Sequence, residues 1–156
     1  MSRAPPLPEV SAVQAQGPST EVAQVRAEQL RERIEQILRV RKERFDRAEQ
    51  RIAGHIEKVR VLADRVAAAG GDVSAAEAAL ARAEADLGEA AALEARAVEQ
   101  FQAIPGAEDK RAAYKAAWET AKKAATELRS ARRNVHEAVK LLREEIRELR
   151  SAGGSG

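Results

Sequence analysis

Apolar residues in residues 107–151 recur at the spacing of a coiled coil. Two rows, each with a period of seven and offset from the other by four residues, run through this segment. The rows are Tyr114, Ala121, Leu128, Val135, Leu142 and Leu149, and Trp118, Ala125, Arg132, Val139 and Ile146. A sustained seven-residue period predicts a long amphipathic helix in a left-handed supercoil.

Two further segments carry rows of the same kind. In residues 20–69 the rows are Leu38, Phe45, Ile52, Val59 and Val66, and Ile34, Arg41, Ala48, His55 and Leu62. In residues 73–104 they are Val73, Leu80, Leu87, Glu94 and Phe101, and Ala76, Ala83, Ala90, Ala97 and Ile104. The pattern therefore predicts three helices, at about residues 20–69, 73–104 and 107–151.

The first break between helices lies at Gly70 and Gly71. A glycine pair can adopt the left-handed conformation that ends a helix. Ser74 and Glu77 have the spacing of a capping box for the next helix, and Asp72 is the alternative cap.

The second break is Pro105-Gly106. Because both connections are short, neighbouring helices must be antiparallel. We expect an all-α fold, an elongated antiparallel three-helix coiled coil with up-down-up topology, over residues 20–151. A flexible proline-rich leader is expected at residues 1–19, and a Gly/Ser tail, a linker or cloning remnant, at residues 152–156.

Composition narrows the kind of core this fold can have. Apolar residues make up 44% of the chain, aromatic residues only 3%, and cysteine is absent. Alanine supplies much of the apolar content, so we expect a thin core. The absence of cysteine excludes disulfides, a thiol nucleophile and a cysteine zinc site. The four aromatic residues are expected to form one cluster near Pro105.

Charge favours the same arrangement. Net charges are +3 for residues 20–69, −5 for residues 72–104 and +4 for residues 107–151. An acidic helix between two basic ones suits antiparallel packing, although each exposed ion pair contributes only about 0.3–0.5 kcal/mol.

Measured from the two turns, the outer helices are longer than the zone in which all three helices overlap. The expected overhangs are residues 20–38 and 139–151. Both keep large apolar side chains, and an apolar stripe on a lone helix in water indicates an interaction surface. The candidate partner-binding residues are Val25, Leu30, Ile34, Ile37, Leu38, Leu141, Leu142, Ile146 and Leu149.

Candidate catalytic chemistry is weak. His55 and His136 are the only histidines, and neither has a second ligand at metal-binding spacing. Glu94, Arg41 and Arg132 interrupt the apolar rows. They could form a buried acid–base pair, but polar residues that fix the helix register are the preferred interpretation. We expect no enzyme activity, no cofactor and no metal.

The turn from Ala68 to Leu80, the Ala/Glu-rich segment after it and the Ile104-Pro105-Gly106 break resemble a group of uncharacterised bacterial proteins. These are Ala-rich three-helix coiled-coil proteins of the candidate-phyla type, found in the envelope or secreted. The resemblance covers about residues 35–145. It implies an extracellular or cell-envelope location and no activity; a cytoplasmic location follows if no signal peptide exists upstream.

The favoured function is a structural or interaction module that packs helices against a protein partner. Head-to-tail contact between the overhangs would make a homo-oligomer or filament. A nucleic-acid-binding protein is the first alternative, because basic clusters such as 39–44 and 129–133 occur, although acidic residues interleave with some of them. An exchangeable lipid-binding or membrane-surface bundle is the second alternative. No apolar stretch is long enough for a transmembrane segment.

Overall fold

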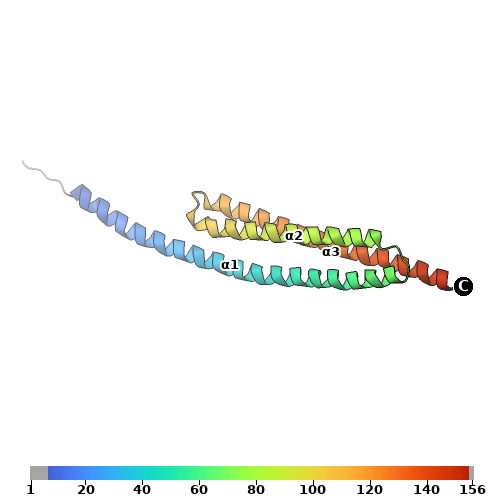
Figure 1. The fold of residues 1–156 in the computed structure, drawn as a ribbon. Helices are drawn as coiled ribbons and strands as arrows, with labels where there is room; N and C mark the ends of the chain where they lie inside the picture. Colours follow the sequence, from blue (N-terminus) through green and yellow to red (C-terminus); the bar gives the residue numbers. More distant parts are fainter. Residues whose placement is uncertain (1–6, 155–156) are drawn as a thin grey trace, which may run out of the picture.

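The chain folds into three long helices that lie side by side (Figure 1). The computed structural model describes the backbone of residues 7–154 and the side chains of residues 20–153. The helices are α1 (Leu7–Ala68), α2 (Ser74–Ala103) and α3 (Lys110–Gly154), and a short 3-10 helix, η1 (Ile104–Gly106), joins α2 to α3. The described backbone contains no strand. The predicted all-α, up-down-up architecture is confirmed.

The start of α1 and the end of α3 differ from the predicted helix ends. α1 begins at Leu7 instead of residue 20, and α3 ends at Gly154 instead of residue 151. The leader predicted at residues 1–19 lies outside the residues whose side chains are described, and so does the end of the predicted tail. Both stay predictions.

The turn after α1 is a Schellman motif, and it requires both glycines. Gly70 has a φ of 95°, which is the left-handed conformation that glycine adopts without strain. The Gly71 amide donates to the Val66 carbonyl at 2.9 Å, and the Gly70 amide donates to the Ala67 carbonyl at 3.0 Å. A Cβ atom on Gly71 would lie 2.6 Å from Val66 Cγ1, so any larger residue there would displace the end of α1.

The start of α2 uses Asp72 and not the predicted capping box. The Asp72 carboxylate accepts hydrogen bonds from the Ser74 amide at 3.0 Å and from the Ser74 hydroxyl at 2.7 Å. These bonds stabilise the charged form and lower the pKa of Asp72 below its ordinary value. The Asp72 amide donates in turn to the Glu145 carboxylate at 2.8 Å, which ties this turn to α3. Val73 occupies the N-cap position without a side-chain hydrogen bond.

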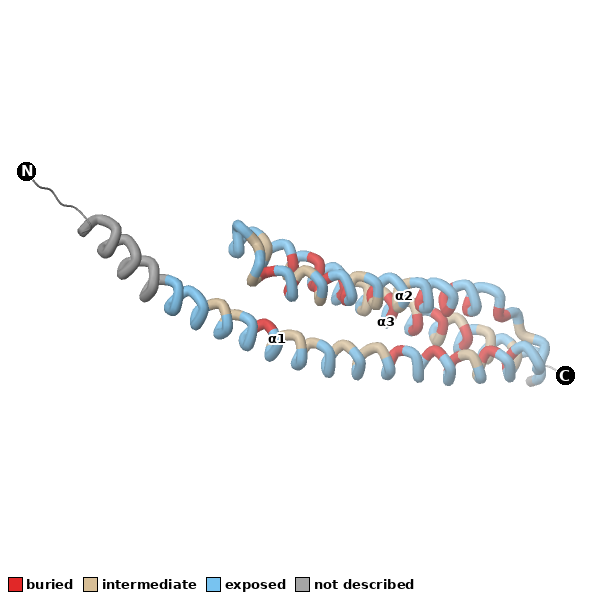
Figure 2. The backbone as a smooth tube through the Cα atoms, turned by 60° about the vertical axis from the view of Figure 1, so that its left-hand side comes forward, coloured by how far each residue is buried: buried red, intermediate tan, exposed pale blue. Residues whose placement is uncertain are grey.

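Alanine dominates the contact between α2 and α3. These two helices make a closer and more continuous contact with each other than either makes with α1, and Figure 2 shows α2 and α3 running together with α1 further away along much of its length. The fully buried alanines are Ala76, Ala79, Ala83, Ala90 and Ala97 on α2, and Ala117, Ala121, Ala124, Ala131 and Ala138 on α3. Small side chains allow two helix axes to approach closely, so the predicted thin core is found here.

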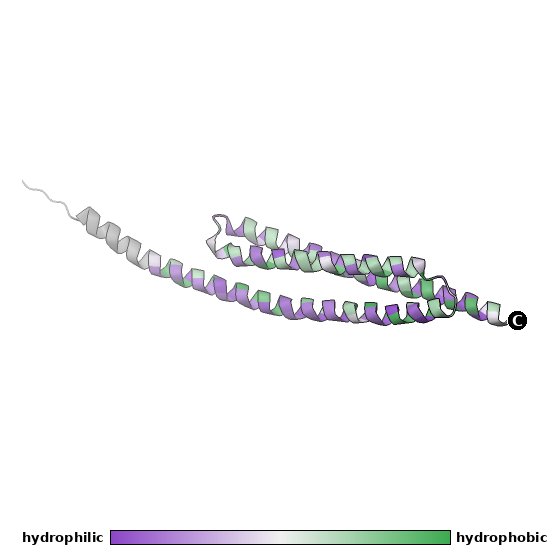
Figure 3. Cartoon of the chain, in the orientation of Figure 1, coloured by the Kyte–Doolittle hydropathy of each residue, from purple (hydrophilic) through white to green (hydrophobic). Residues whose placement is uncertain are grey.

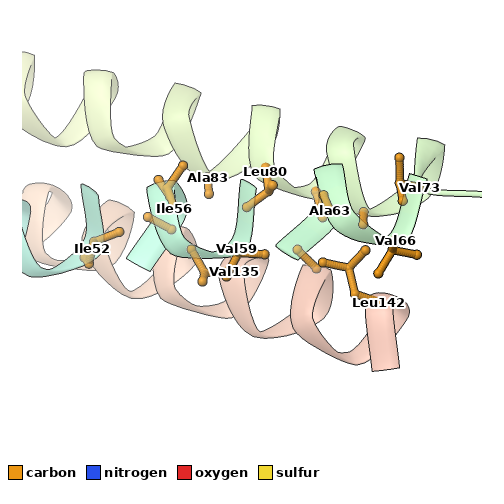
Figure 4. Close-up of a cluster of buried hydrophobic side chains, with 14 residues drawn as sticks. Ile52, Ile56, Val59, Ala63, Val66, Val73, Leu80, Ala83, Val135 and Leu142 are labelled. Atoms are coloured by element: carbon orange, nitrogen blue, oxygen red, sulfur yellow. The ribbon is translucent and has the colours of Figure 1, made fainter. Parts of the chain in front are cut away.

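Larger side chains hold α1 to this pair at two places. The first cluster, near the Gly70 turn, contains Ile52, Ile56, Val59 and Val66 of α1 (Figure 4). The second, near Pro105, contains a single fully buried residue of α1, Ile34. Hydrophilic and hydrophobic residues alternate along the coloured part of α1 (Figure 3), as expected for a helix with one buried face.

Beyond Ile52 one of the two predicted rows of α1 holds, with Val59 and Val66 buried, and the other is displaced by one residue. Ile56 and Ala63 are buried where the seven-residue period placed His55 and Leu62, and His55 is exposed. Successive residues on this face, Phe45, Ala48, Ile52 and Ile56, are separated by three, four and four positions, or eleven in total. An eleven-residue spacing locally unwinds a left-handed supercoil. The predicted position of His55 in the seam is therefore wrong.

Candidate functional site

Most of the predicted partner-binding residues are buried or partly buried within this chain. Ile34 is 4% exposed and Leu142 is fully buried, both inside the core of this chain. Six others are partly buried and pack against one of the two clusters: Leu30, Ile37, Leu38, Leu141, Ile146 and Leu149. Val25, at 52% exposure, is the member of the set that stays open to solvent. The prediction that all these side chains lack a partner within the chain is therefore wrong.

Each overhang begins further from the middle of the bundle than predicted, and the position of each turn explains why. α1 passes Pro105 at the level of Leu30 to Ile34, because Leu30 and Pro105 line one hollow and Ile34 and Pro105 line another. At the opposite end α3 covers the Gly70 turn itself. Leu142 shares a cluster with Val66 and Val73 there, so residues just after 139 remain within the bundle.

Three of the four aromatic residues form the predicted cluster. The Phe101 ring lies 5.1 Å from Trp118 and 6.3 Å from Tyr114, and Tyr114 lies 6.1 Å from Trp118, all edge to face. This geometry is favourable because the edge of one ring meets the negative face of another. Phe45 is not part of the cluster, but it lines a hollow beside Trp118.

A mostly buried ion pair joins α1 to α2 at this hollow. Arg41 Nη2 donates to Glu94 Oε2 at 2.7 Å, and the Glu94 side chain is only 9% exposed. The Arg41 guanidinium carbon lies 5.4 Å from the centre of the Trp118 ring, within range for a cation–π contact. Arg41 Nε and Glu94 Oε1 are buried without a hydrogen-bond partner. Opposite charge and burial favour a fixed pair that holds α1 in register.

The apolar rows single out Arg41 and Glu94 as polar positions, but heptad position alone does not say which residue each of them faces. If each turn reversed the chain about its central residue, Glu94 would face Lys115 of α3 and either Arg47 or Arg51 of α1. The actual partner, Arg41, lies six residues closer to the N-terminus of α1 than Arg47. Arg132, the third polar residue in the predicted rows, is exposed on α3.

The hollow lies between α1 and α3 and has a volume of about 580 Å³. No residue of α1 between Ile34 and Ile52 is fully buried, so the hollow occupies the gap between the two clusters. Apolar side chains predominate in its lining, with Gln36, Arg41, Arg44 and Glu94 as the polar members. The apolar and aromatic lining residues are Ile37, Val40, Phe45, Ala48, Trp118, Ala125 and Leu128.

Groups that could hold a metal ion do not converge among the described residues. His55 and His136 are both exposed, on different helices. No three His, Cys, Asp or Glu side chains of the described residues lie where they could share a metal ion. Over the same part of the chain, no helix combines the length and the apolar character needed to cross a membrane.

The chain matches no protein-family model, no curated protein sequence and no solved structure. The resemblance to bacterial Ala-rich coiled-coil proteins therefore stays a prediction, and the function has to be argued from the surfaces described above.

Proposed function

We propose that this chain is a non-enzymatic interaction module that packs helices against a protein partner, and that its first partner is a second copy of itself. The observation that carries the proposal is the free face of α1 beyond the Pro105 turn. Val22 and Val25 are about half exposed on this face, and Leu30 is partly buried at its inner end. Burying one valine fully contributes roughly 1.5–3 kcal/mol, so these side chains favour association.

The opposite end of the bundle offers a receptor for that face. A hollow of about 340 Å³ lies between α1 and α3 beside the Gly70 turn. Its walls are mainly the apolar side chains of Leu62, Ile146 and Leu149, and Arg65 and Arg150 stand at its margin. The hollow is large enough to accept apolar side chains from another helix.

Charge supports this pairing of unlike ends. Residues 20–38 carry four acidic and three basic side chains, whereas residues 139–151 carry three acidic and four basic ones, and Arg65 and Arg150 line the hollow at the Gly70 end. Contact between residues 20–38 of one copy and residues 139–151 of the next joins two different surfaces. Such a heterologous contact repeats from copy to copy and can extend into a filament.

Sedimentation velocity over a range of protein concentrations tests the proposal. We expect the intact chain to sediment faster as its concentration rises, and we expect Val25→Glu to remove this dependence. Val40→Glu is the matched control, because Val40 on the same helix is 48% exposed, lies outside residues 20–38 and lines the separate hollow beside Trp118. A wild-type chain that stays monomeric at all concentrations contradicts the proposal, and so does equal loss of association in both variants.

A further inference from the structure

We propose that the hollow between α1 and α3 that Phe45 and Trp118 line is a binding site for an amphipathic organic anion, such as a fatty-acid carboxylate. This site is separate from the two end surfaces and does not depend on self-association. It is formed where α1 spans from one hydrophobic cluster to the other without fully burying its own apolar side chains.

The size and lining of the hollow suit an apolar chain. Ligand sites commonly have volumes of about 300–1,000 Å³ and are lined by apolar and aromatic side chains with few polar groups. This hollow has about 580 Å³, and Phe45, Trp118 and Leu128 contribute large apolar surfaces to it. Val40 at its edge is 48% exposed, so a bound chain would remove apolar surface from water.

The two clusters limit the hollow along α1. Ile34 is buried beyond one end of the hollow and Ile52 beyond the other, so α1 closes against α2 and α3 on both sides. A partner helix would need an open groove along the bundle, whereas a single alkyl chain fits within a limited length. This closure favours a small amphiphile over a second copy of the chain as the occupant.

The charges at the hollow select an anion. Glu94 is paired with Arg41, and its second oxygen, Oε1, is covered, so this carboxylate is not open to a cationic head group. Arg44 also lines the hollow and is exposed. No ion pair of Arg44 occurs among the described residues. Its guanidinium can bind a carboxylate through two parallel hydrogen bonds.

Trp118 provides a direct measurement, because it is the single tryptophan of the chain and it lines the hollow. Dodecanoate is titrated below its micelle concentration while tryptophan fluorescence is followed. Dodecanol and dodecyltrimethylammonium carry the same alkyl chain with a neutral and a cationic head group. We expect a saturable change with dodecanoate, binding of dodecanol about two- to fivefold weaker, as for the loss of one exposed ion pair, and the weakest binding for the cation.

Two pairs of variants separate the apolar and the charged part of the site. Ala125 and Ala116 are both exposed on α3, but only Ala125 lines the hollow, so Ala125→Leu adds bulk at the hollow and Ala116→Leu adds the same bulk outside it. We expect only Ala125→Leu to abolish binding. Arg44→Gln should weaken dodecanoate two- to fivefold and leave dodecanol unchanged, whereas Arg47→Gln, at an exposed α1 position outside the lining, should leave both unchanged.

The proposal is overturned if dodecanoate gives no saturable change, or if Ala125→Leu binds as well as Ala116→Leu. It is also overturned if Arg44→Gln affects dodecanoate and dodecanol equally. A Trp118 signal that changes with protein concentration alone would assign the hollow to a second copy instead. Circular dichroism checks that each variant stays helical, and the Val25→Glu background keeps this test independent of self-association.

Discussion

The interface between α2 and α3 and the interface that α1 makes with them are built from different side chains. Between α2 and α3, buried alanines follow one another along nearly the whole contact. Against α1, isoleucine, valine and leucine gather in two clusters, with a hollow between them. Alanine provides little apolar area per residue but allows close approach, whereas large aliphatic residues anchor a helix at separate points.

This difference assigns different mechanical roles to the helices. A close and continuous interface leaves α2 and α3 few alternative arrangements, because interiors packed at high density respond strongly to changes in volume. α1 depends on anchors separated by a loosely packed stretch, and such stretches are where local opening costs least. We therefore regard α2 and α3 as the rigid part and residues 35–51 of α1 as the adaptable part.

The largest expected effect comes from removing an anchor of α1. Ile52 is fully buried in the first cluster, so Ile52→Ala should lower the free energy of unfolding by about 2–5 kcal/mol. Ile37→Ala is the matched change on the same helix. Ile37 lines the hollow and is only partly buried, and its truncation should cost about 1 kcal/mol. Urea unfolding monitored by circular dichroism measures both values.

Equal losses for Ile52→Ala and Ile37→Ala would contradict the division of α1 into anchored and adaptable segments. They would mean that the stretch beside the hollow is packed as firmly as the first cluster.

An intermediate effect is expected when alanine is enlarged. Ala131→Leu inserts bulk between α2 and α3, where the alanine is fully buried, and overpacking of this kind costs about 1–3 kcal/mol. Ala48→Leu adds the same bulk beside the hollow, and the change should stay within about 0.5 kcal/mol. If the two substitutions have the same effect in urea unfolding, the α2–α3 contact is not the tighter one.

The sequence was sufficient to predict the helices and their topology, because heptad spacing and two short breaks are local signals. The predicted rows of α2 hold along its length, since alanines at Ala76, Ala83, Ala90 and Ala97 are all buried. In α1 one predicted row holds beyond Ile52, through Val59 and Val66, and the other fails, because Ile56 is buried in place of His55. An eleven-residue spacing conflicts with a strict period of seven, and only the packing of the neighbouring helices decides between them.

The candidate site was less predictable, because it depends on relative helix position. Polar residues within apolar rows marked Arg41 and Glu94, but which one faces which depends on where each turn reverses the chain. A shift of one helical turn moves a side chain by about 5.4 Å, which is enough to exchange one partner for another. The hollow had no sequence signal at all, since it arises where two clusters leave a gap.

The smallest expected effect concerns the ion pair at that gap. We expect a double-mutant cycle of Arg41→Met and Glu94→Gln to give a coupling energy of about 1 kcal/mol, because both side chains are largely shielded from water. Arg60 and Glu84 form the matched control, a second pair between α1 and α2 whose side chains are 42% and 46% exposed. Their coupling should be below about 0.5 kcal/mol.

The salt dependence of the coupling energy distinguishes the two ion pairs further. Exposed charges are screened within a Debye length of about 10 Å at 0.1 M salt, whereas buried pairs are screened much less. Raising the salt concentration should therefore remove the coupling between Arg60 and Glu84 and leave most of that between Arg41 and Glu94. If both couplings disappear together, water reaches the Arg41–Glu94 pair, and α1 opens over the hollow further than its two anchors imply.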